Sequence, residues 1–336
     1  MVKISRRKMI KQSSLAVTTL AIPFPITAIT KFNNMTDKKH YEVIIIGGSY
    51  AGLSAAMALG RALRTVLIID SGKPCNLQTP HSHNFITQDG ETPNAIAKKA
   101  KNQVLKYDTV KFYDGLAVSG KKTSKGYLIK TEKDDEFTAK KLIFVTGLKD
   151  IMPNINGFTD CWGISILHCP YCHGYEVKNE KTGILANGNF AFHFAQLITN
   201  WTKDLTIFTN GKSTLTQEQI DRISNHNIPI IEKEITEIKH DNGYVEQIVF
   251  KDNSAFNLKA IYSRPAFEQH CKIPQTLGCE LTEQGLIQVD MFQKTTADGI
   301  FACGDNASPL RAVSYAVATG NIAASIANNE MTIEEF

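Results

Sequence analysis

The amino-acid sequence predicts an α/β protein with two parallel-sheet domains, and three observations support this fold class. A β-branched run, a glycine turn, a helix and a second strand occupy residues 41–70, and the same order returns over residues 182–212. Near the C-terminus, an apolar strand that ends in Gly304-Asp305 precedes a helix of small residues. Strands that alternate with helices in this way favour parallel sheets covered by helices.

The charge distribution excludes one large class of function. The chain of 336 residues has a formal charge of +4, but residues 1–31 contain six basic side chains and no acid. The other 305 residues carry 31 basic and 33 acidic groups, a formal charge of −2. A protein that binds nucleic acid needs a basic surface on its folded part. Nucleic acid is therefore not expected as a partner.

Residues 1–31 have the pattern of a twin-arginine export signal. Arg6 and Arg7 lie in a basic segment, and an uncharged run follows over residues 12–30. Pro23 and Pro25 interrupt this run, which disfavours a stable membrane span. The alternatives are a short membrane anchor and a cytoplasmic extension. We expect export of a folded protein to the periplasm or beyond, and otherwise a cytoplasmic protein.

The segment 41–70 predicts a dinucleotide site. Gly47 permits a tight turn, Gly52 lets the following helix approach the strand, and Asp70 at the end of the next strand can accept hydrogen bonds from a ribose. The middle glycine of the G-x-G-x-x-G pattern is replaced by Ser49. A glycine turn in an ordinary α/β domain is the alternative, but it does not explain Asp70. The predicted cofactor contacts are Gly47, Gly48, Ser49, Ala51, Gly52 and Asp70.

The C-terminal segment predicts a second part of the same site. Its strand ends in Gly304-Asp305, which places one carboxylate where a ribityl or sugar hydroxyl can be held. The helix predicted over 314–327 can offer N–H groups to a flavin carbonyl. A strand that ends in Thr146-Gly147 fits the point where the chain leaves this domain.

This order is typical of FAD enzymes in which an insertion splits the flavin domain. The predicted architecture is an FAD domain over residues 38–151 and 264–336, with an inserted NAD(P)-binding-like domain over 152–263. Both domains are expected to be Rossmann-like, in a three-layer β/β/α arrangement. FAD is the predicted cofactor.

The inserted domain carries a redox motif, Cys169-Pro-Tyr-Cys172-His173, preceded by His168. Two thiols separated by two residues can close a disulfide and exchange it with an external thiol. A zinc site would need a second ligand pair. A glutaredoxin-like domain would place the pair after its first strand, and c-type haem attachment would conflict with export of a folded protein. No metal site is predicted, because His81 and His83 alone form a poor one.

These residues resemble the low-molecular-weight thioredoxin reductase family, with the closest pattern in the branch of gliotoxin-type dithiol oxidases. The resemblance covers residues 40–330 and rests on the glycine turn, Thr146-Gly147, the cysteine pair, and Gly304-Asp305 followed by Arg311-Ala312-Val313. It implies FAD, a homodimer, and a thiol or disulfide substrate, either a protein such as thioredoxin or a small dithiol.

The resemblance also implies residue roles. Cys172 would face the flavin, and Cys169 would exchange with the substrate. The family has an acid after the pair where this chain has His173, so His173 and His168 are candidates for acid–base catalysis. Asn76, Asn84, Arg311, Ala312 and Val313 are further candidates for cofactor contacts.

The second strand–turn–helix departs from the family pattern, and this puts NADPH in doubt. Ala186 replaces the first glycine of G-x-G-x-x-A, and the basic cluster expected after the next strand is reduced to Lys212. No acid ends that strand, so the arrangement that favours NAD is also missing. The main prediction is an FAD-dependent thiol–disulfide oxidoreductase. Its alternatives are a dithiol oxidase that does not use NADPH and a non-catalytic flavin-binding redox sensor.

Overall fold

The computed structural model of the protein describes residues 39–336. The export signal predicted over residues 1–31 lies outside these residues and stays a prediction. Within residues 39–336, no helix is long and apolar enough to cross a bilayer.

The larger sheet has seven strands and is built around one long strand, β6 (Glu136–Phe144). It pairs in parallel with β1 over most of its length and with β17 at its C-terminal end, while its N-terminal half pairs antiparallel with β5. The strand order is β3-β2-β1-β6-β5-β4, with β17 also on β6. The other strands are β1 (His40–Ile46), β2 (Val66–Asp70), β3 (Val110–Asp114), β4 (Ala117–Thr123), β5 (Gly126–Thr131) and β17 (Ile300–Ala302).

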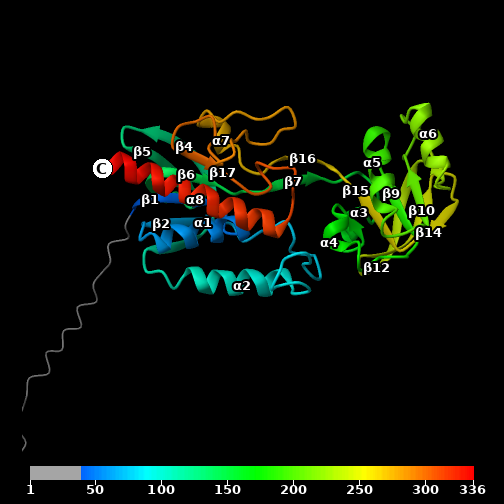
Figure 1. Ribbon diagram of the computed structural model, residues 1–336, viewed down its shortest axis with the longest axis horizontal. Helices are drawn as coiled ribbons and strands as arrows, with labels where there is room; N and C mark the ends of the chain where they lie inside the picture. The colour runs from blue at the N-terminus through cyan, green and yellow to red at the C-terminus, as the bar shows by residue number, and fades with distance from the viewer. Residues whose placement is uncertain (1–38) are drawn as a thin grey trace, which may run out of the picture. The chain divides into compact units, whose positions relative to one another are not determined.

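Helices cover one face of this sheet and the β4–β5 hairpin covers the other. The apolar strand residues divide accordingly between a helix-side core and a hairpin-side core. Figure 1 shows α8 (red) beside α1, and a side chain at Gly320 of α8 would collide with the Ala51 carbonyl of α1. The predicted three-layer β/β/α arrangement is confirmed. The helices on the helix side are α1 (Tyr50–Arg61), α2 (Pro93–Val104) and α8 (Val313–Glu335), while the short helix α7 (Ile273–Thr276) packs on the hairpin side.

A second, five-stranded parallel sheet has the order β11-β10-β9-β15-β8. A three-stranded antiparallel sheet, β12-β13-β14, packs next to it through shared apolar residues. The strands are β8 (Ile166–Leu167), β9 (Thr182–Leu185), β10 (Leu205–Phe208), β11 (Ile230–Ile231), β12 (Ile235–Asp241), β13 (Tyr244–Phe250), β14 (Ala255–Asn257) and β15 (Ala260–Ser263). The helices are α3 (Phe158–Cys161), α4 (Pro170–His173), α5 (Gly188–Ile198) and α6 (Gln217–Ser224).

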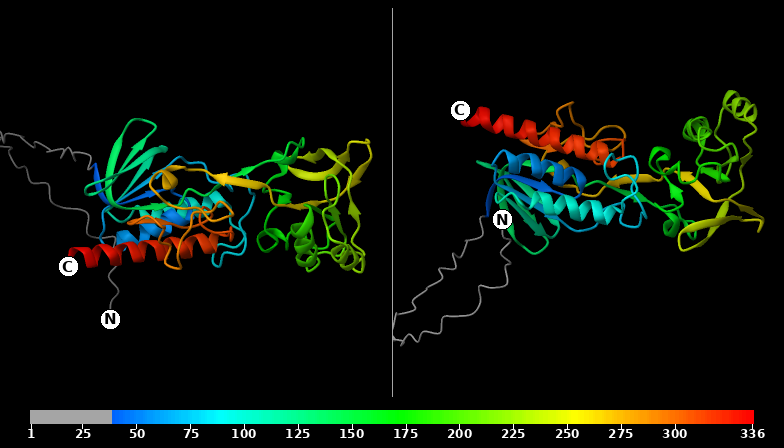
Figure 2. Two further views of the ribbon diagram at one scale, coloured as in Figure 1. Left: turned by 90° about the horizontal axis from the view of Figure 1, so that it is seen from above. Right: turned by 60° about the horizontal axis from the view of Figure 1, so that its bottom comes forward.

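Two antiparallel strands connect these groups of elements. The chain leaves the larger sheet along β7 (Leu148–Ile151) and returns along β16 (Ala266–Gln269), as Figures 1 and 2 show. The predicted domain limits at residues 151 and 264 thus fall at the end of β7 and just before β16.

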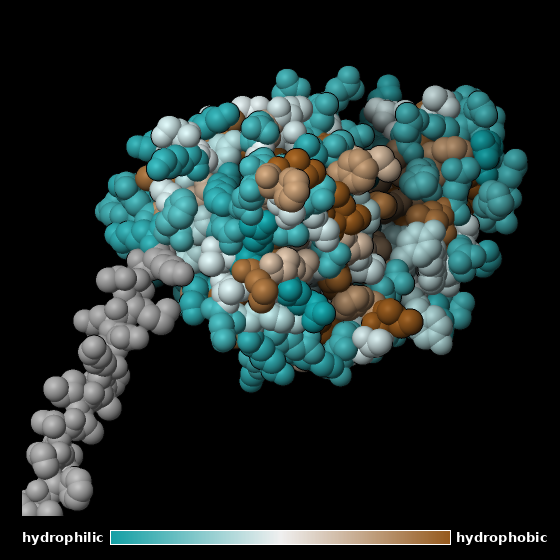
Figure 3. Space-filling view, turned by 60° about the vertical axis from the view of Figure 1, so that its left-hand side comes forward, coloured by the Kyte–Doolittle hydropathy of each residue, from teal (hydrophilic) through white to brown (hydrophobic). Residues whose placement is uncertain are grey.

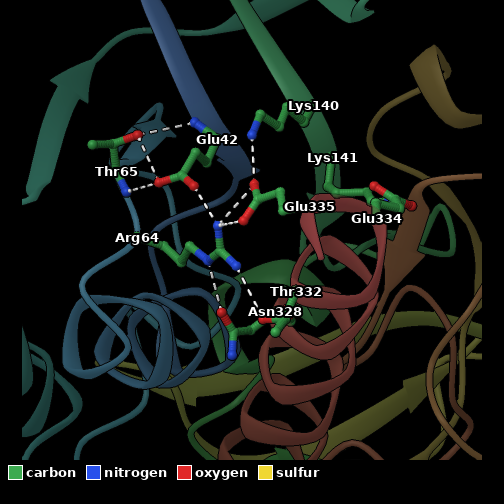
Figure 4. Close-up of polar contacts among 9 residues, drawn as sticks. All are labelled: Glu42, Arg64, Thr65, Lys140, Lys141, Asn328, Thr332, Glu334 and Glu335. Atoms are coloured by element: carbon green, nitrogen blue, oxygen red, sulfur yellow. Dashed lines mark hydrogen bonds and ion pairs between the residues drawn. The ribbon is translucent and has the colours of Figure 1, made fainter.

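An ionic network holds the C-terminal end of α8 against the larger sheet (Figure 4). Acidic side chains are unfavourable at a helix C-terminus, because the helix dipole is negative there. Here Glu335 accepts hydrogen bonds from Arg64 and Lys140, and Glu334 pairs with the nearly buried Lys141. The basic partners therefore neutralise the acidic end of the helix.

Arg64 is the centre of this network, and its loss is expected to destabilise the fold. Its side chain is 12% exposed, and its guanidinium lies 2.6 Å from Glu42 and 2.8 Å from Glu335. We expect Arg64→Met to lower the free energy of unfolding by about 2 kcal/mol, because Glu42 keeps its charge without its partner. Lys140→Ala is the matched control, since the Lys140 side chain is 41% exposed and should contribute less than about 1 kcal/mol. Urea unfolding measures both, and equal losses would contradict the prediction.

Candidate active site

The glycine turn after β1 brings the backbone close to Asp70. Gly47 has a φ of 110°, which a side chain would strain, and a β-carbon on Gly48 would lie 2.8 Å from that of Asp70. The Gly48 N–H donates to Asp70 Oδ1 at 2.9 Å. The turn and the carboxylate predicted from sequence are therefore neighbours at the carboxyl end of the sheet, where α/β proteins bind dinucleotides.

A cavity of about 1220 Å³ opens at this edge. It exceeds the roughly 300–1,000 Å³ of pockets for drug-sized ligands, so it suits a dinucleotide. Three of the predicted residues, Gly52, Asn84 and Cys169, are not among its lining residues. The predicted residues that do line it are Gly47, Gly48, Ser49, Ala51, Asp70, Asn76, Thr146, Gly147, His168, Cys172, His173, Gly304, Asp305, Arg311, Ala312 and Val313.

The residues at the cavity fit FAD. The glycine turn offers a backbone cradle that side chains would fill, Asp70 is an acceptor for ribose hydroxyls, and Asp305 lies at the second predicted position. Burial raises the pKa of Asp305, and the Arg311 guanidinium opposes this effect. Asn76 donates to the Tyr50 hydroxyl at 3.3 Å, which holds the loop after Asp70 near the cavity.

Arg311 has a partner that the sequence did not indicate. Its guanidinium forms two hydrogen bonds with Asp150 of β7, at 2.7 and 3.0 Å, and lies 3.5 Å from Asp305. Arg311 therefore ties the segment before α8 to the first of the two connecting strands, in addition to lining the cavity.

One cysteine of the redox pair also lines the cavity. Cys169 and Cys172 form a disulfide with their Cα atoms 5.3 Å apart, and only Cys172 lines the cavity. Behind the pair, Gly174 packs against Trp201, and Tyr171 meets the Trp201 ring edge-on. This packing fixes the short helix α4 so that the two sulfur atoms have different surroundings.

Both histidines beside the pair favour the neutral form. Burial lowers the pKa of His168 to about 4, and its Nε2 has no hydrogen-bond partner among the described residues. Burial also lowers the pKa of His173, and the charge of His83 lowers it further. A neutral imidazole can accept a proton from a thiol, so both remain candidates for the base.

Two further residues line the cavity. The sequence indicated no role for Cys75, and it indicated His83 only as a poor metal ligand. Cys75 is a free thiol that lines the cavity and is exposed there. His83 also lines the cavity and faces His173 with 6.4 Å between ring centroids. Within residues 39–336, no group of three or more potential ligands could hold a metal ion.

A dinucleotide-sized cavity with a C-x-x-C disulfide in its wall defines a flavin-dependent disulfide oxidoreductase. A model of the pyridine nucleotide-disulphide oxidoreductase family matches residues 41–320. Thioredoxin reductase sirT of Leptosphaeria maculans is 31% identical, covering 86% of this chain and 93% of that protein. Thioredoxin reductase tcpT of Claviceps purpurea is 30% identical, covering 88% of this chain and 96% of that protein.

Solved structures agree with these relatives. An oxidoreductase from Agrobacterium tumefaciens is 34% identical with a TM-score of 0.82, over 88% of this chain and 99% of its own. The chain belongs to the pyridine nucleotide-disulphide oxidoreductase family. It is an FAD-dependent oxidoreductase of the thioredoxin reductase type. The resemblance stated from the sequence is thereby confirmed.

Proposed function

We propose that this protein oxidises dithiols through the Cys169–Cys172 disulfide and FAD, and that NADPH is not its electron donor. The single observation that carries the second part is the side chain of Asn187, which occupies the turn of the second strand–turn–helix unit. Export, if it occurs, would give the same conclusion, because NADPH is a cytoplasmic donor.

Asn187 closes the N-terminus of α5, where a dinucleotide-binding domain would hold a pyrophosphate. Its Oδ1 accepts hydrogen bonds from the N–H groups of Gly188 and Thr214, both at 2.8 Å, and from the Thr214 hydroxyl at 3.1 Å. Its Nδ2 donates to the Lys212 carbonyl at 2.9 Å. Pyrophosphate binding would have to break this cap, so the free energy of binding falls by the cost of the lost bonds.

Two further side chains lie at the carboxyl end of the second sheet, next to the turn. The strand order of the second sheet reverses between β9 and β15, and ligands of such sheets bind at this point. There the Arg264 guanidinium lies 5.6 Å from the ring centroid of Phe190 in the first turn of α5. A nicotinamide that entered here would have to stack on this pair or displace it.

The redox pair supports a division of labour between the two sulfur atoms. Bound FAD supplies the two-electron acceptor, and Cys172, which lines the same cavity, is the sulfur next to it. Cys169 is bonded to Cys172 but does not itself line the cavity, and it is the sulfur that a substrate thiolate attacks. His173 and His168 are neutral neighbours that can accept the substrate proton.

The surroundings of the pair favour a substrate with apolar surface. Apolar side chains are exposed in several groups on the face drawn in Figure 3. Beside the cavity lining, Tyr171, Tyr175 and Leu77 are 64%, 69% and 70% exposed. Contiguous exposed apolar surface marks binding sites, and these side chains are the candidates for it beside the pair. A small apolar dithiol and a protein thiol both fit this description, and a homodimer is part of the same proposal.

Anaerobic spectroscopy tests the proposal. We expect dithiothreitol to bleach the flavin absorbance of the FAD-loaded protein, while micromolar NADPH bleaches it slowly or not at all. Oxygen consumption with the dithiol then separates turnover from a passive redox sensor. Rapid and complete bleaching by micromolar NADPH would overturn the proposal and restore an NADPH-dependent reductase.

A further inference from the structure

The loop over residues 81–91 holds His83 near the redox pair, and its own hydrogen bonds fix its conformation. Ser82 and Glu91 pair as in a β-bridge, with the Ser82 N–H donating to the Glu91 carbonyl at 2.8 Å. The Asn84 N–H donates to Asp89 Oδ1 at 2.7 Å, and His81 Nδ1 lies 2.9 Å from the Gly90 carbonyl. The loop is therefore closed by its own hydrogen bonds and does not depend on the His83 ring.

His83 itself lies between two carboxylates and a histidine. Its Nδ1 is 3.7 Å from Asp89 and its Nε2 is 3.5 Å from Glu176, while its ring faces the His173 ring edge-on. Its side chain is 20% exposed, whereas those of Glu176 and Asp89 are 40% and 68% exposed. A chain of titratable groups thus leads from His173, in the cavity wall, to solvent.

We propose that His83 is a positioning residue for the redox pair. Together with Glu176 and Asp89, His83 sets the charge of His173 and transfers the proton of His173 to solvent. This inference rests on the proposed function, because it concerns the reduction of the disulfide by a dithiol. It assigns a role to the loop over 81–91 that no sequence motif indicated.

The proton balance of the dithiol reaction shows why His173 needs a path for its proton to solvent. One substrate thiol gives its proton to His173, and the thiolate attacks Cys169 as the Cys169–Cys172 bond breaks and Cys172 leaves as a thiolate. The second substrate thiol then displaces Cys169, which takes the second proton. The substrate gains an S–S bond and loses two electrons to the cysteine pair, and His173 retains one proton. His173 must lose that proton before it can act again.

The charged groups around His173 act on it in opposite directions. Burial lowers the pKa of His173, the charge of His83 lowers it further, and Glu176 opposes both effects. His168 is the other titratable neighbour of His173, while His81, Asp89 and Glu176 face His83. Removing His83 should therefore raise the pKa of His173, and removing the Glu176 charge should lower it.

The test is the pH profile of flavin reduction by dithiothreitol, measured anaerobically by stopped flow on the FAD-loaded full chain. We expect the acidic limb to move up by about 0.5–1 pH unit in His83→Asn and down by a similar amount in Glu176→Gln. The ionisation of dithiothreitol contributes equally to every profile, so dividing each variant's profile by that of the wild type cancels this contribution. Glu180→Gln, an exposed carboxylate in the same segment, is the matched control and should not move the limb.

The outcomes separate this inference from the proposed function. Wild-type flavin that dithiols do not reduce at any pH would overturn the proposed function and this inference with it. Reducible wild-type flavin with unmoved limbs in both variants, or with limbs that move in the same direction, would overturn the role of His83 alone. FAD content and circular dichroism establish that each variant is folded.

Discussion

Cys169→Ser is expected to abolish dithiol turnover while FAD stays bound. Cys169 does not line the cavity, so its loss leaves the predicted cofactor contacts in place, yet it removes the sulfur that the substrate attacks. Loss of a covalent catalyst lowers the rate by about 10³-fold or more. The ratio of flavin to protein and the rate of oxygen consumption with dithiothreitol measure the two effects. A variant that keeps wild-type turnover would refute the assignment.

Comparison with Cys172→Ser assigns the two sulfur atoms. Turnover should also fall in this variant, but the free thiol of Cys169 should react with a thiol reagent faster than the Cys172 thiol of Cys169→Ser, which bound FAD covers. Cys279→Ala, a thiol without a redox partner, is the control and should keep wild-type turnover. Faster labelling of Cys172 would reverse the roles of the two cysteines.

The elements that sequence predicted well are those whose causes are local. The glycine turn and Asp70 belong to one strand–helix–strand unit, and in such a unit both must lie at the carboxyl end of the sheet. The cysteine pair needs only a three-residue separation to close. The roles that were assigned to these residues by resemblance stay predictions until the variants are measured.

Contacts between segments that are distant in the chain could not be predicted from the sequence. Asp150 and Arg311 are separated by 161 residues in the chain, and neither belongs to a motif that names the other. Asn187 lies in a degenerate glycine turn. Only the fold shows that its Oδ1 accepts a hydrogen bond from the N–H of Thr214, which follows the next strand. Asn84 lies in the loop after Asp70, where its positive φ of 58° and its N–H bond to Asp89 belong to a turn, and it does not line the cavity.

The C-terminal end of helix α8 was mispredicted, because the residues that stabilise it lie elsewhere in the chain. The pattern of small residues predicted a helix over 314–327, whereas α8 continues to Glu335. Asn, Thr and paired acids near a helix C-terminus argue for an earlier end, because they have low propensity or oppose the helix dipole. The basic partners that compensate, Arg64 and Lys140, lie on other elements and are absent from the local pattern.

Gly52→Val is expected to give a protein that retains little or no FAD. A β-carbon at Gly52 would collide with the Gly47 carbonyl, so α1 would have to move away from the glycine turn that forms the cofactor cradle. Backbone is the colliding group, and it cannot rotate away as a side chain can. Flavin absorbance after gel filtration measures the retention, and circular dichroism separates loss of FAD from loss of fold.

Ser49→Gly is the matched change at the same turn and should keep FAD bound. Ser49 has a φ of −85°, so a side chain is tolerated there, and the substitution restores the missing middle glycine of the motif. If Gly52→Val binds FAD as tightly as the wild type, the close approach of α1 to the turn is not what forms the cofactor site. If instead Ser49→Gly loses FAD, the serine hydroxyl is a cofactor contact, and the substitution in the glycine pattern is a functional one.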